Sequence, residues 1–439
     1  LLREQDRHVS IVDAPSNDGV TLDELVPRLV ALLRNKPALA HSLRSRWRWV
    51  FVDEYQDVDA DQYELLRLLV PPDGNLCAIG DPDQAIYSFR GADVRFFLQF
   101  ARDFTDARVV RLTRNYRSSA PIIAAAVQAI APTSLVPGRR LDPAKVDPEA
   151  PLLGRYAAGS TAEEAEFVAR TVDELVGGVS HRSKAADTRG LQSISVSFGD
   201  IAVLYRTDAQ AGAIVDALHR AGIPVQKRSH DRLRDRAAVA ALAAEMRLAA
   251  PGVTARLPDR IKQAAQVLAE RPALDSTLTP EELWAAVELL TPLARRCEKD
   301  GLPAFLAEIA LGAEVDALDH RAEAVTLLTL HAAKGLEFPV VFLAGCEDGL
   351  LPLRLPGAAA RMTPEELAAA EAEERRLFFV GITRAQRRLY FTHSAKRYRH
   401  GSERESSPTP FLAPIDGGLL EWLGDSAPVR RRDQQLRLI

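Results

Sequence analysis

Two acidic residues near the start of the sequence have the types and position needed for phosphate chemistry. Asp53 and Glu54 come directly after Trp49–Val52, a short apolar run that predicts a buried parallel strand. Ligands of open α/β sheets lie at the carboxyl ends of such strands. There an Asp can hold Mg²⁺, and a neighbouring Glu can polarise an attacking water. An exposed acidic turn explains the same residues about equally well, so this segment alone leaves both interpretations open.

A glutamine, two aromatic residues and an arginine follow a second apolar run, Leu76–Ile79. Gln84 can sense a γ-phosphate through a hydrogen bond, and Arg90 can meet a phosphate. Tyr87 and Phe89 offer faces on which bases stack, an interaction worth roughly 1–3 kcal/mol per base. Packing of both rings in the core is the alternative, and it is the better interpretation of this segment taken alone.

Two arginines elsewhere could reach a transferring phosphoryl group. Arg117 and its neighbour Tyr116, whose ring could hold adenine, come after Val109–Leu112, which we predict to be a third strand. Arg384 is the next-to-last residue of the segment Glu373–Ala385. An arginine at such a position can act as an arginine finger.

Other charged residues of these segments have simpler explanations. Arg375 and Arg376 stand at helical spacing from Glu371–Glu374, which predicts ion pairs on a solvated helix face. The segment His331–Phe338 joins a cation, a glycine and an acid between apolar runs, and it lacks the GxxxxGK[ST] spacing of a P-loop. A charged turn is its alternative. The basic stretch 396–400 indicates either a phosphate contact or a solvated strand and turn.

Alternating strands and helices must position these residues. Ile201–Leu204 and Val340–Leu343 repeat the buried-strand pattern, and residues 21–45 carry apolar side chains at helical spacing. This alternation predicts an α/β fold with parallel sheets covered by helices. Residues 228–324 are rich in Ala, Leu, Arg and Glu and contain no convincing strand, so we predict a helical insertion there.

Composition narrows the class of protein. A chain of 439 residues favours two to four domains, and a net charge of −4 excludes an overall basic field, so any nucleic-acid contact must come from local patches. Cys77, Cys297 and Cys346 have no metal-ligand spacing, which predicts buried, reduced thiols in a cytoplasmic protein. No stretch has the apolar length of a membrane span, so we expect no membrane contact.

Taken in order, these segments closely resemble motifs II to VI of the UvrD/PcrA/Rep-type superfamily 1 helicases. The resemblance runs from about Leu22 to Phe411, and five ordered motifs make coincidence negligible. It implies RecA-like P-loop NTPase lobes, the first incomplete at its N-terminus, with parallel sheets and an α-helical insertion. The implied domains are 1–104 (end of the first lobe), 105–227 (first half of the second lobe), 228–324 (helical accessory insertion), 325–415 (second half of the second lobe) and 416–439 (flexible tail).

The resemblance also implies catalytic roles in an ATP-dependent DNA motor that moves in the 3′→5′ sense. Asp53 would bind Mg²⁺, Glu54 would activate water, and Gln84 would couple the γ-phosphate to DNA. Arg117 and Arg384 would stabilise the transferring phosphoryl group.

The remaining implied roles concern the nucleotide and the DNA. Tyr116 would stack on adenine and Glu337 would contact the ribose. The implied partners are single-stranded DNA and duplex junctions. The residues implied to lie towards single-stranded DNA are Tyr87, Phe89, Arg90, His331 and Lys334.

Three departures from the family pattern affect these expectations. The Walker A loop and its lysine have no counterpart here, and the family places them upstream of residue 1, so we expect the chain alone to hydrolyse little or no ATP. Phe89 stands where these helicases usually have Trp, and the helical insertion looks short. The end of the chain resembles a peptide that docks on the sliding clamp, with a meaningless tail as the alternative; its residues are Gln435, Leu436, Leu438 and Ile439.

Two other functions remain open on the sequence alone. An ATPase-dead scaffold that binds DNA or partners would explain the missing P-loop. Against it, a lobe without its first strand and P-loop helix would expose apolar sheet surface, a folding liability. The motor part of a helicase–nuclease is the third possibility, although only a short tail follows the last motif. Stacking and phosphate contacts serve both nucleic acids, so DNA is preferred over RNA by the family resemblance alone.

Overall fold

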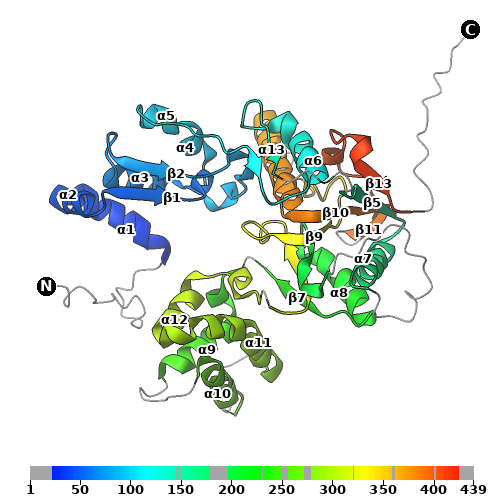
Figure 1. Ribbon diagram of the computed structural model, residues 1–439. Helices are drawn as coiled ribbons and strands as arrows, with labels where there is room; N and C mark the ends of the chain where they lie inside the picture. Colours follow the sequence, from blue (N-terminus) through cyan, green and yellow to red (C-terminus); the bar gives the residue numbers. More distant parts are fainter. Residues whose placement is uncertain are drawn as a thin grey trace, which may run out of the picture. The chain divides into compact units, whose positions relative to one another are not determined.

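The computed structural model describes residues 22–144, 147, 150–177, 196–229, 231–248, 256–270, 278–319, 321–357, 361–399 and 402–424 (Figure 1). The chain forms two compact units. Unit 1 contains the residues up to Asp81, Tyr87–Val109 and Ser229–Asp319. Unit 2 contains Pro82–Ile86, Val110–Arg228 and the residues after Asp319. The chain therefore crosses between the units several times.

The first part of unit 1 is a small α/β arrangement around two parallel strands. Strand β1 pairs with β2 in register from Trp49 opposite Asn75 to Val52 opposite Ala78, which confirms both predicted strands. The predicted helix over 21–45 is two helices, because Pro37 opens the second one. The elements are α1 (Leu22–Asn35), α2 (Pro37–Arg46), β1 (Trp49–Val52), η1 (Tyr55–Asp57), α3 (Ala60–Leu69), β2 (Asn75–Ala78), η3 (Ser88–Arg90), α4 (Val94–Leu98) and α5 (Phe100–Asp103).

One face of strand β1 carries large apolar side chains in contact with solvent. Trp49 is 69% exposed and Phe51 is 70% exposed, while Val50 and Val52, which point the other way, are half-buried. A buried parallel strand normally has both faces covered. Among the described residues, this face of β1 is therefore left uncovered.

The second part of unit 1 is helical, and its described residues contain no strand. Helix α11 begins with a capping box between Thr279 and Glu282, and it packs against α9 and α10 around a core that includes Leu242, Ile261 and Leu290. The elements are η8 (Leu233–Asp235), α9 (Ala237–Leu248), α10 (Leu257–Glu270), α11 (Pro280–Arg296), η9 (Cys297–Lys299), α12 (Gly301–Leu311) and η10 (Glu314–Ala317).

Unit 2 is built on a seven-stranded sheet in the order β13-β5-β10-β9-β6-β8-β7, and every pairing in it is parallel. All five residues of β6 are buried, as the apolar run predicted. The strands are β5 (Leu153–Ala158), β6 (Ile201–Tyr205), β7 (Val225–Arg228), β8 (Val325–Thr329), β9 (Phe338–Leu343), β10 (Ala385–Ser394) and β13 (Leu420–Trp422).

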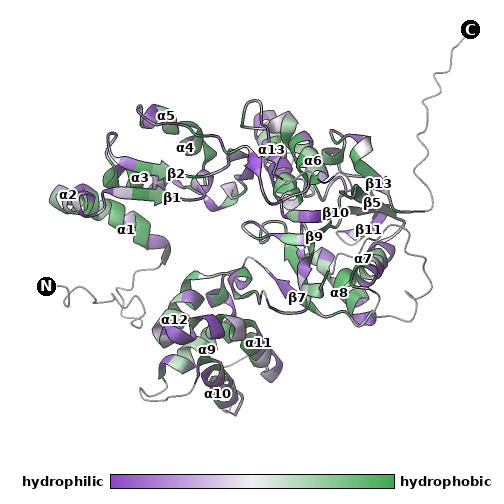
Figure 2. Ribbon diagram, viewed as in Figure 1, coloured by the Kyte–Doolittle hydropathy of each residue, from purple (hydrophilic) through white to green (hydrophobic). Residues whose placement is uncertain are grey.

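Helices cover both faces of this sheet. Helices α7 (Thr161–Leu175) and α8 (Ala211–Arg220) share a core with Val340 and Phe342 of β9. Helix α13 (Pro364–Ile382) approaches the opposite face, where a Cβ on Gly381 would lie 2.6 Å from Leu330 and 3.0 Å from Leu343. Helix α6 (Ala120–Ile130), apolar along most of its length, packs beside α13 (Figures 1 and 2). This arrangement confirms the α/β class with parallel sheets.

Short elements complete unit 2. They are η2 (Pro82–Gln84), β3 (Arg114–Asn115), η4 (Ala131–Thr133), β4 (Asp142–Pro143), η6 (Phe198–Asp200), η7 (Asp208–Gln210), β11 (Lys396–Arg399), β12 (Ser402–Glu405), η12 (Pro410–Leu412) and η13 (Gly417–Leu419). The predicted strand Val109–Leu112 is wrong: it has no strand conformation, and its apolar side chains are exposed. The chain passes from unit 1 to unit 2 between Val109 and Val110, so this apolar run lies on a crossing segment outside either sheet.

Candidate functional site

The two strand-end acids of unit 1 are exposed and held in an uncommon backbone conformation. Glu54 has φ 49° and ψ 41°, the left-handed region that a non-glycine residue rarely adopts. Asp53 accepts a hydrogen bond from the Glu54 amide at 2.9 Å. Such conformations persist where the surroundings enforce them, and they gather at functional sites. The left-handed turn directs two adjacent carboxylates from the carboxyl end of β1.

A buried glutamine, Gln56, holds this turn in place. The Gln56 side chain is fully buried, and its amide donates to the Glu54 carboxylate. Its carbonyl oxygen accepts from the Asp81 amide at 3.0 Å, which ties the ends of β1 and β2 together. Gly80 lies so close to this carbonyl that a Cβ there would overlap it. The sequence interpretation did not single out Gln56, although it lies within the acidic motif.

The acids have the donor chemistry of a magnesium site that is shared with a nucleotide. Mg²⁺ prefers oxygen ligands, and proteins usually hold it through one or two carboxylates plus substrate phosphates. The described residues contain no group of three or more His, Cys, Asp or Glu that could hold a metal alone. Asp53, with Glu54 beside it, supplies carboxylate oxygens of the kind that such an ion takes from a protein.

The aromatic residues of the second motif differ in exposure. Phe89 is 65% exposed, whereas burial, followed by the charge of Asp57, raises the pKa of Tyr87 to about 12. The Arg90 guanidinium lies 5.7 Å from the centroid of each ring. Cation–π contact at this distance holds an arginine over an aromatic face. Phe89 is thus the ring best placed to stack on a base, and the core interpretation suits Tyr87 better.

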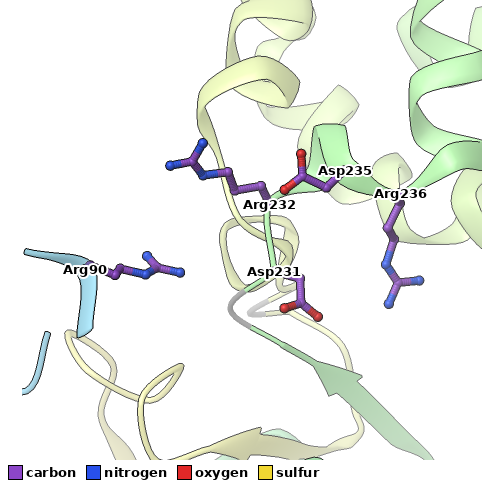
Figure 3. A pocket seen from close by; sticks show the side chains of 5 residues that line it. All are labelled: Arg90, Asp231, Arg232, Asp235 and Arg236. Carbon is purple, nitrogen blue, oxygen red and sulfur yellow. The ribbon is translucent and has the colours of Figure 1, made fainter. Parts of the chain in front are cut away.

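A cavity of about 370 Å³ lies beside Arg90 in unit 1. It is lined by Arg90, Asp231, Arg232, Asp235 and Arg236 (Figure 3). Arg232 already pairs with Asp23 at 2.9 Å, and Arg236 pairs with the buried Glu314. Two of the three arginines that line the cavity are therefore already paired with carboxylates of the protein.

The two candidate arginine fingers lie together in unit 2, at the amino ends of β9 and β10. Arg117 pairs with Glu337, and its guanidinium also donates to the Thr383 carbonyl at 3.4 Å. Arg384 is buried and donates to the carbonyls of Val380 at 2.9 Å and Leu336 at 3.1 Å. The structure therefore brings together three residues that lie far apart in the sequence.

The remaining candidate for a nucleotide contact, Tyr116, is exposed. Tyr116 is 78% exposed, and the Arg114 guanidinium lies 5.4 Å from its ring centroid. An exposed ring that a cation partly covers is suited to stacking. Asn115 fixes this turn, since its side-chain oxygen accepts from the amides of Arg117 at 3.0 Å and Ser118 at 2.9 Å.

Gln84 and Lys334 also meet in unit 2. The Lys334 ammonium donates to the Gln84 carbonyl at 2.8 Å, so part of its hydrogen-bonding capacity is used within the protein. His331 and Lys334 are both half-buried in the loop between β8 and β9.

The surroundings of three arginines differ from those predicted. Arg375 and Arg376 are not on a solvated face: Arg375 is buried and donates to the Ala129 carbonyl at 3.0 Å, and Arg376 donates to the Ala85 carbonyl at 2.8 Å. In the basic stretch, Arg397 is buried and two carboxylates, Glu164 and Glu347, match its charge, so neither a phosphate contact nor a solvated strand describes this residue.

The cysteines differ in exposure. Cys297 and Cys346 are buried as predicted, but Cys77 is exposed because it lies on the uncovered face of β2.

The residues that resemble a clamp-docking peptide lie outside the described residues; they are Gln435, Leu436, Leu438 and Ile439. Among the described residues, no helix has the length and apolar character needed to span a membrane.

Comparison with known proteins matches the chain to two family models. The UvrD/REP helicase N-terminal domain matches residues 11–105, and the UvrD-like helicase C-terminal domain matches residues 110–251 and 275–396. The chain belongs to the UvrD/REP helicase family. The resemblance inferred from the ordered motifs is thereby confirmed.

Known members of the UvrD/REP helicase family align over most of this chain. The ATP-dependent DNA helicase UvrD1 of Mycobacterium tuberculosis is 31% identical, covering 92% of this chain and 62% of the relative. The ATP-dependent DNA helicase PcrA of Bacillus subtilis is 29% identical, covering 94% and 64%. The chain thus spans less than two thirds of the length of these relatives. A solved C-terminal domain of a possible DNA helicase from a Lactobacillus aligns with 70% of this chain and 98% of its own, at 13% identity and a TM-score of 0.30, too low to bear on the fold.

Proposed function

We propose that this chain is part of an ATP-dependent DNA helicase or translocase that moves in the 3′→5′ sense along single-stranded DNA. The grouping of Arg117, Glu337 and Arg384 beside the exposed Tyr116 carries the proposal. Two guanidinium groups, a carboxylate and an open aromatic ring suit a nucleotide better than a protein partner. The names of the family relatives, ATP-dependent DNA helicases, agree with this assignment.

The residues divide the work of phosphoryl transfer. Glu54, held in its left-handed turn, would orient and polarise the attacking water, and Asp53 would hold Mg²⁺. The ion, when bound, supplies charge neutralisation at the phosphate oxygens. Arg117 and Arg384 would stabilise the negative charge that develops in the transition state, and an arginine in this role is worth roughly 10³–10⁵ in kcat.

We also propose that the phosphate-binding loop comes from further chain in the whole protein. The chain spans 62–64% of its relatives' length, and Trp49 and Phe51 leave one face of β1 uncovered. Additional strands and a helix would cover that face and complete the first lobe. The DNA contacts proposed for this chain come from Phe89, Arg90 and the β8–β9 loop that carries His331 and Lys334.

The test is hydrolysis of ATP by the complete natural protein, with and without single-stranded DNA. DNA should stimulate hydrolysis, and Glu54→Gln should lower kcat about 10²–10⁴-fold, the usual contribution of a general base. Glu288→Gln, an exposed glutamate on α11, is the matched control and should leave the rate unchanged. Hydrolysis that DNA does not stimulate, or that survives in Glu54→Gln, would overturn the proposal.

The direction of movement needs its own measurement. Arrival of the protein at a fluorophore on the 5′ end of a DNA strand, and not at one on the 3′ end, is the expected result. The reverse pattern would refute the 3′→5′ assignment while leaving the motor proposal intact.

A further inference from the structure

The short segment Pro82–Ile86, which carries Gln84, is held by unit 2, although the chain on either side of it belongs to unit 1. The chain leaves unit 1 after Asp81 and returns to it at Tyr87. Five residues between two such crossings have little core of their own. Their conformation must therefore come from side chains of unit 2 that contact them.

The residue before Gln84 makes the strongest of these contacts. Asp83 is fully buried, and its carboxylate accepts from the Ser134 hydroxyl at 2.5 Å and the Leu135 amide at 2.6 Å. The Arg139 guanidinium lies 2.7 Å from the same carboxylate and is nearly buried itself. A buried carboxylate requires such partners, because an unpaired charge in the interior is strongly disfavoured. The Arg139 guanidinium also lies over the Phe379 ring, 5.1 Å from its centroid, which limits its movement.

The next two residues are held through their carbonyls. Lys334 donates to the Gln84 carbonyl at 2.8 Å, and Arg376 donates to the Ala85 carbonyl at 2.8 Å. Burial lowers the pKa of Arg376, while the charges of Glu373 and Asp83 act in the opposite direction. Three cations from separate segments of unit 2 thus fix three consecutive residues, with Gln84 in the middle.

We propose that Arg139 and Arg376 are positioning residues for Gln84. Arg139 holds the Asp83 side chain on one side of it and Arg376 holds the Ala85 carbonyl on the other, so that the Gln84 side chain keeps one orientation toward the nucleotide. This inference rests on the proposed function, in which Gln84 couples the γ-phosphate to DNA. Arg376 lies on α13, the helix that ends just before Arg384. A single helix therefore positions a candidate finger and holds the segment that carries the candidate sensor.

The experiment uses the complete natural protein and Arg376→Met, which removes the donor and keeps the aliphatic length. Stimulation of ATP hydrolysis by single-stranded DNA should fall about ten- to hundred-fold, since misplacing a reacting group by about 1 Å can cost 10²-fold. Affinity for DNA without nucleotide should stay within about two-fold, because Arg376 is not a DNA contact in this scheme. Arg376→Lys, which can still donate to the carbonyl, should recover most of the stimulation.

Two further variants keep the proposal open to refutation. Arg139→Lys retains the charge opposite Asp83 but loses the planar guanidinium over Phe379, and it should lower the stimulation without unfolding the protein. Arg220→Met, which removes an arginine on the exposed part of α8, is the control and should behave like the wild type.

Three results would decide against the inference, and they differ in meaning. If DNA does not stimulate ATP hydrolysis by the wild-type protein, both the proposed function and the inference that rests on it are refuted. If DNA stimulates hydrolysis by the wild type and Arg376→Met keeps that stimulation, only the inference about Arg376 is overturned. An equal loss of hydrolysis, nucleotide-free DNA affinity and thermal stability in Arg376→Met, with no recovery in Arg376→Lys, shows a purely structural role.

Discussion

Substituting Gln56 and Gly80 together should cost less stability than the two separate substitutions predict. Gln56→Ala removes the acceptor of the Asp81 amide and the donor to Glu54. Loss of such a buried partner costs about 1–3 kcal/mol. Gly80→Ala places a methyl group against the Gln56 carbonyl, and overpacking of this kind costs about 1–3 kcal/mol.

The double variant removes the atom with which the new methyl group collides. The next contacts of a Cβ at position 80 are Phe97 at 3.0 Å and the Tyr55 amide nitrogen at 3.1 Å, which small movements relieve. The double variant should therefore be more stable than the sum of the single losses by about 0.5–3 kcal/mol, the range for residues in contact.

The assay is urea unfolding followed by tryptophan fluorescence. Replacing Trp284 and Trp422 with phenylalanine leaves Trp47 and Trp49, beside and within β1, as the reporters. Gly80→Ala combined with Asp61→Ala, an exposed position on α3, is the additive control. Strictly additive losses of stability for the Gln56 and Gly80 substitutions would refute the argument that the Gln56 side chain is the reason why position 80 needs a glycine.

Three further outcomes follow from single contacts. Phe89→Ala should weaken binding of single-stranded DNA to the complete protein by about 1–3 kcal/mol, measured by fluorescence anisotropy, with unchanged affinity counting against stacking. Gly381→Ala should lower the melting temperature, because a Cβ there meets Leu330 at 2.6 Å, whereas Gly212→Ala, with open space around it, should raise stability by about 0.4–1 kcal/mol. Burial, and then the charge of Arg155, lowers the pKa of His393 below 6.5. The unfolded chain therefore binds more protons than the folded chain just below pH 6.5. The free energy of unfolding should fall as the pH is lowered through this range, by at most about 1.4 kcal/mol per pH unit. Unfolding measured from pH 7.5 to 5.5 should show a shallower loss in His393→Gln, and an equal loss would contradict this.

The sequence predicts the buried strands well where a run is apolar throughout. Ile201–Leu204 and Val340–Leu343 both lie in the parallel sheet of unit 2. Strand β10 was not predicted, because Arg387 and Arg388 interrupt its apolar pattern near the beginning. Val109–Leu112 has the right composition, but it lies where the chain changes units, and local composition does not contain that information.

The candidate site was predictable as a set of residues but not as a set of contacts. Helical spacing predicted that Arg375 and Arg376 would pair with acids on their own helix, whereas both donate to backbone carbonyls more than 240 positions away in the sequence. A backbone carbonyl partner cannot be recognised from the sequence, since every residue has a backbone carbonyl. Buried arginines of this kind are therefore recognisable only once the fold brings the two segments together.

Two motifs show the same division between residues that face outward and residues that hold the backbone. In the acidic motif Glu54 is exposed while Gln56, two positions later, is fully buried and bonded to it. In the motif that contains Tyr116 and Arg117, Ser118 is buried and its hydroxyl donates to the Ala385 carbonyl at 2.6 Å.

A side chain that touches a ligand needs a fixed backbone more than it needs burial, because misplacement of a reacting group costs rate steeply. The residue that fixes the backbone can be buried. Its side chain then needs a polar group that can hydrogen-bond to the backbone of a neighbouring strand or strand end. Gln56 and Ser118 meet that requirement in different units, each bridging its own motif to a second strand or strand end. Substituting either should therefore impair the neighbouring exposed residue, even though neither residue is expected to touch nucleotide or DNA.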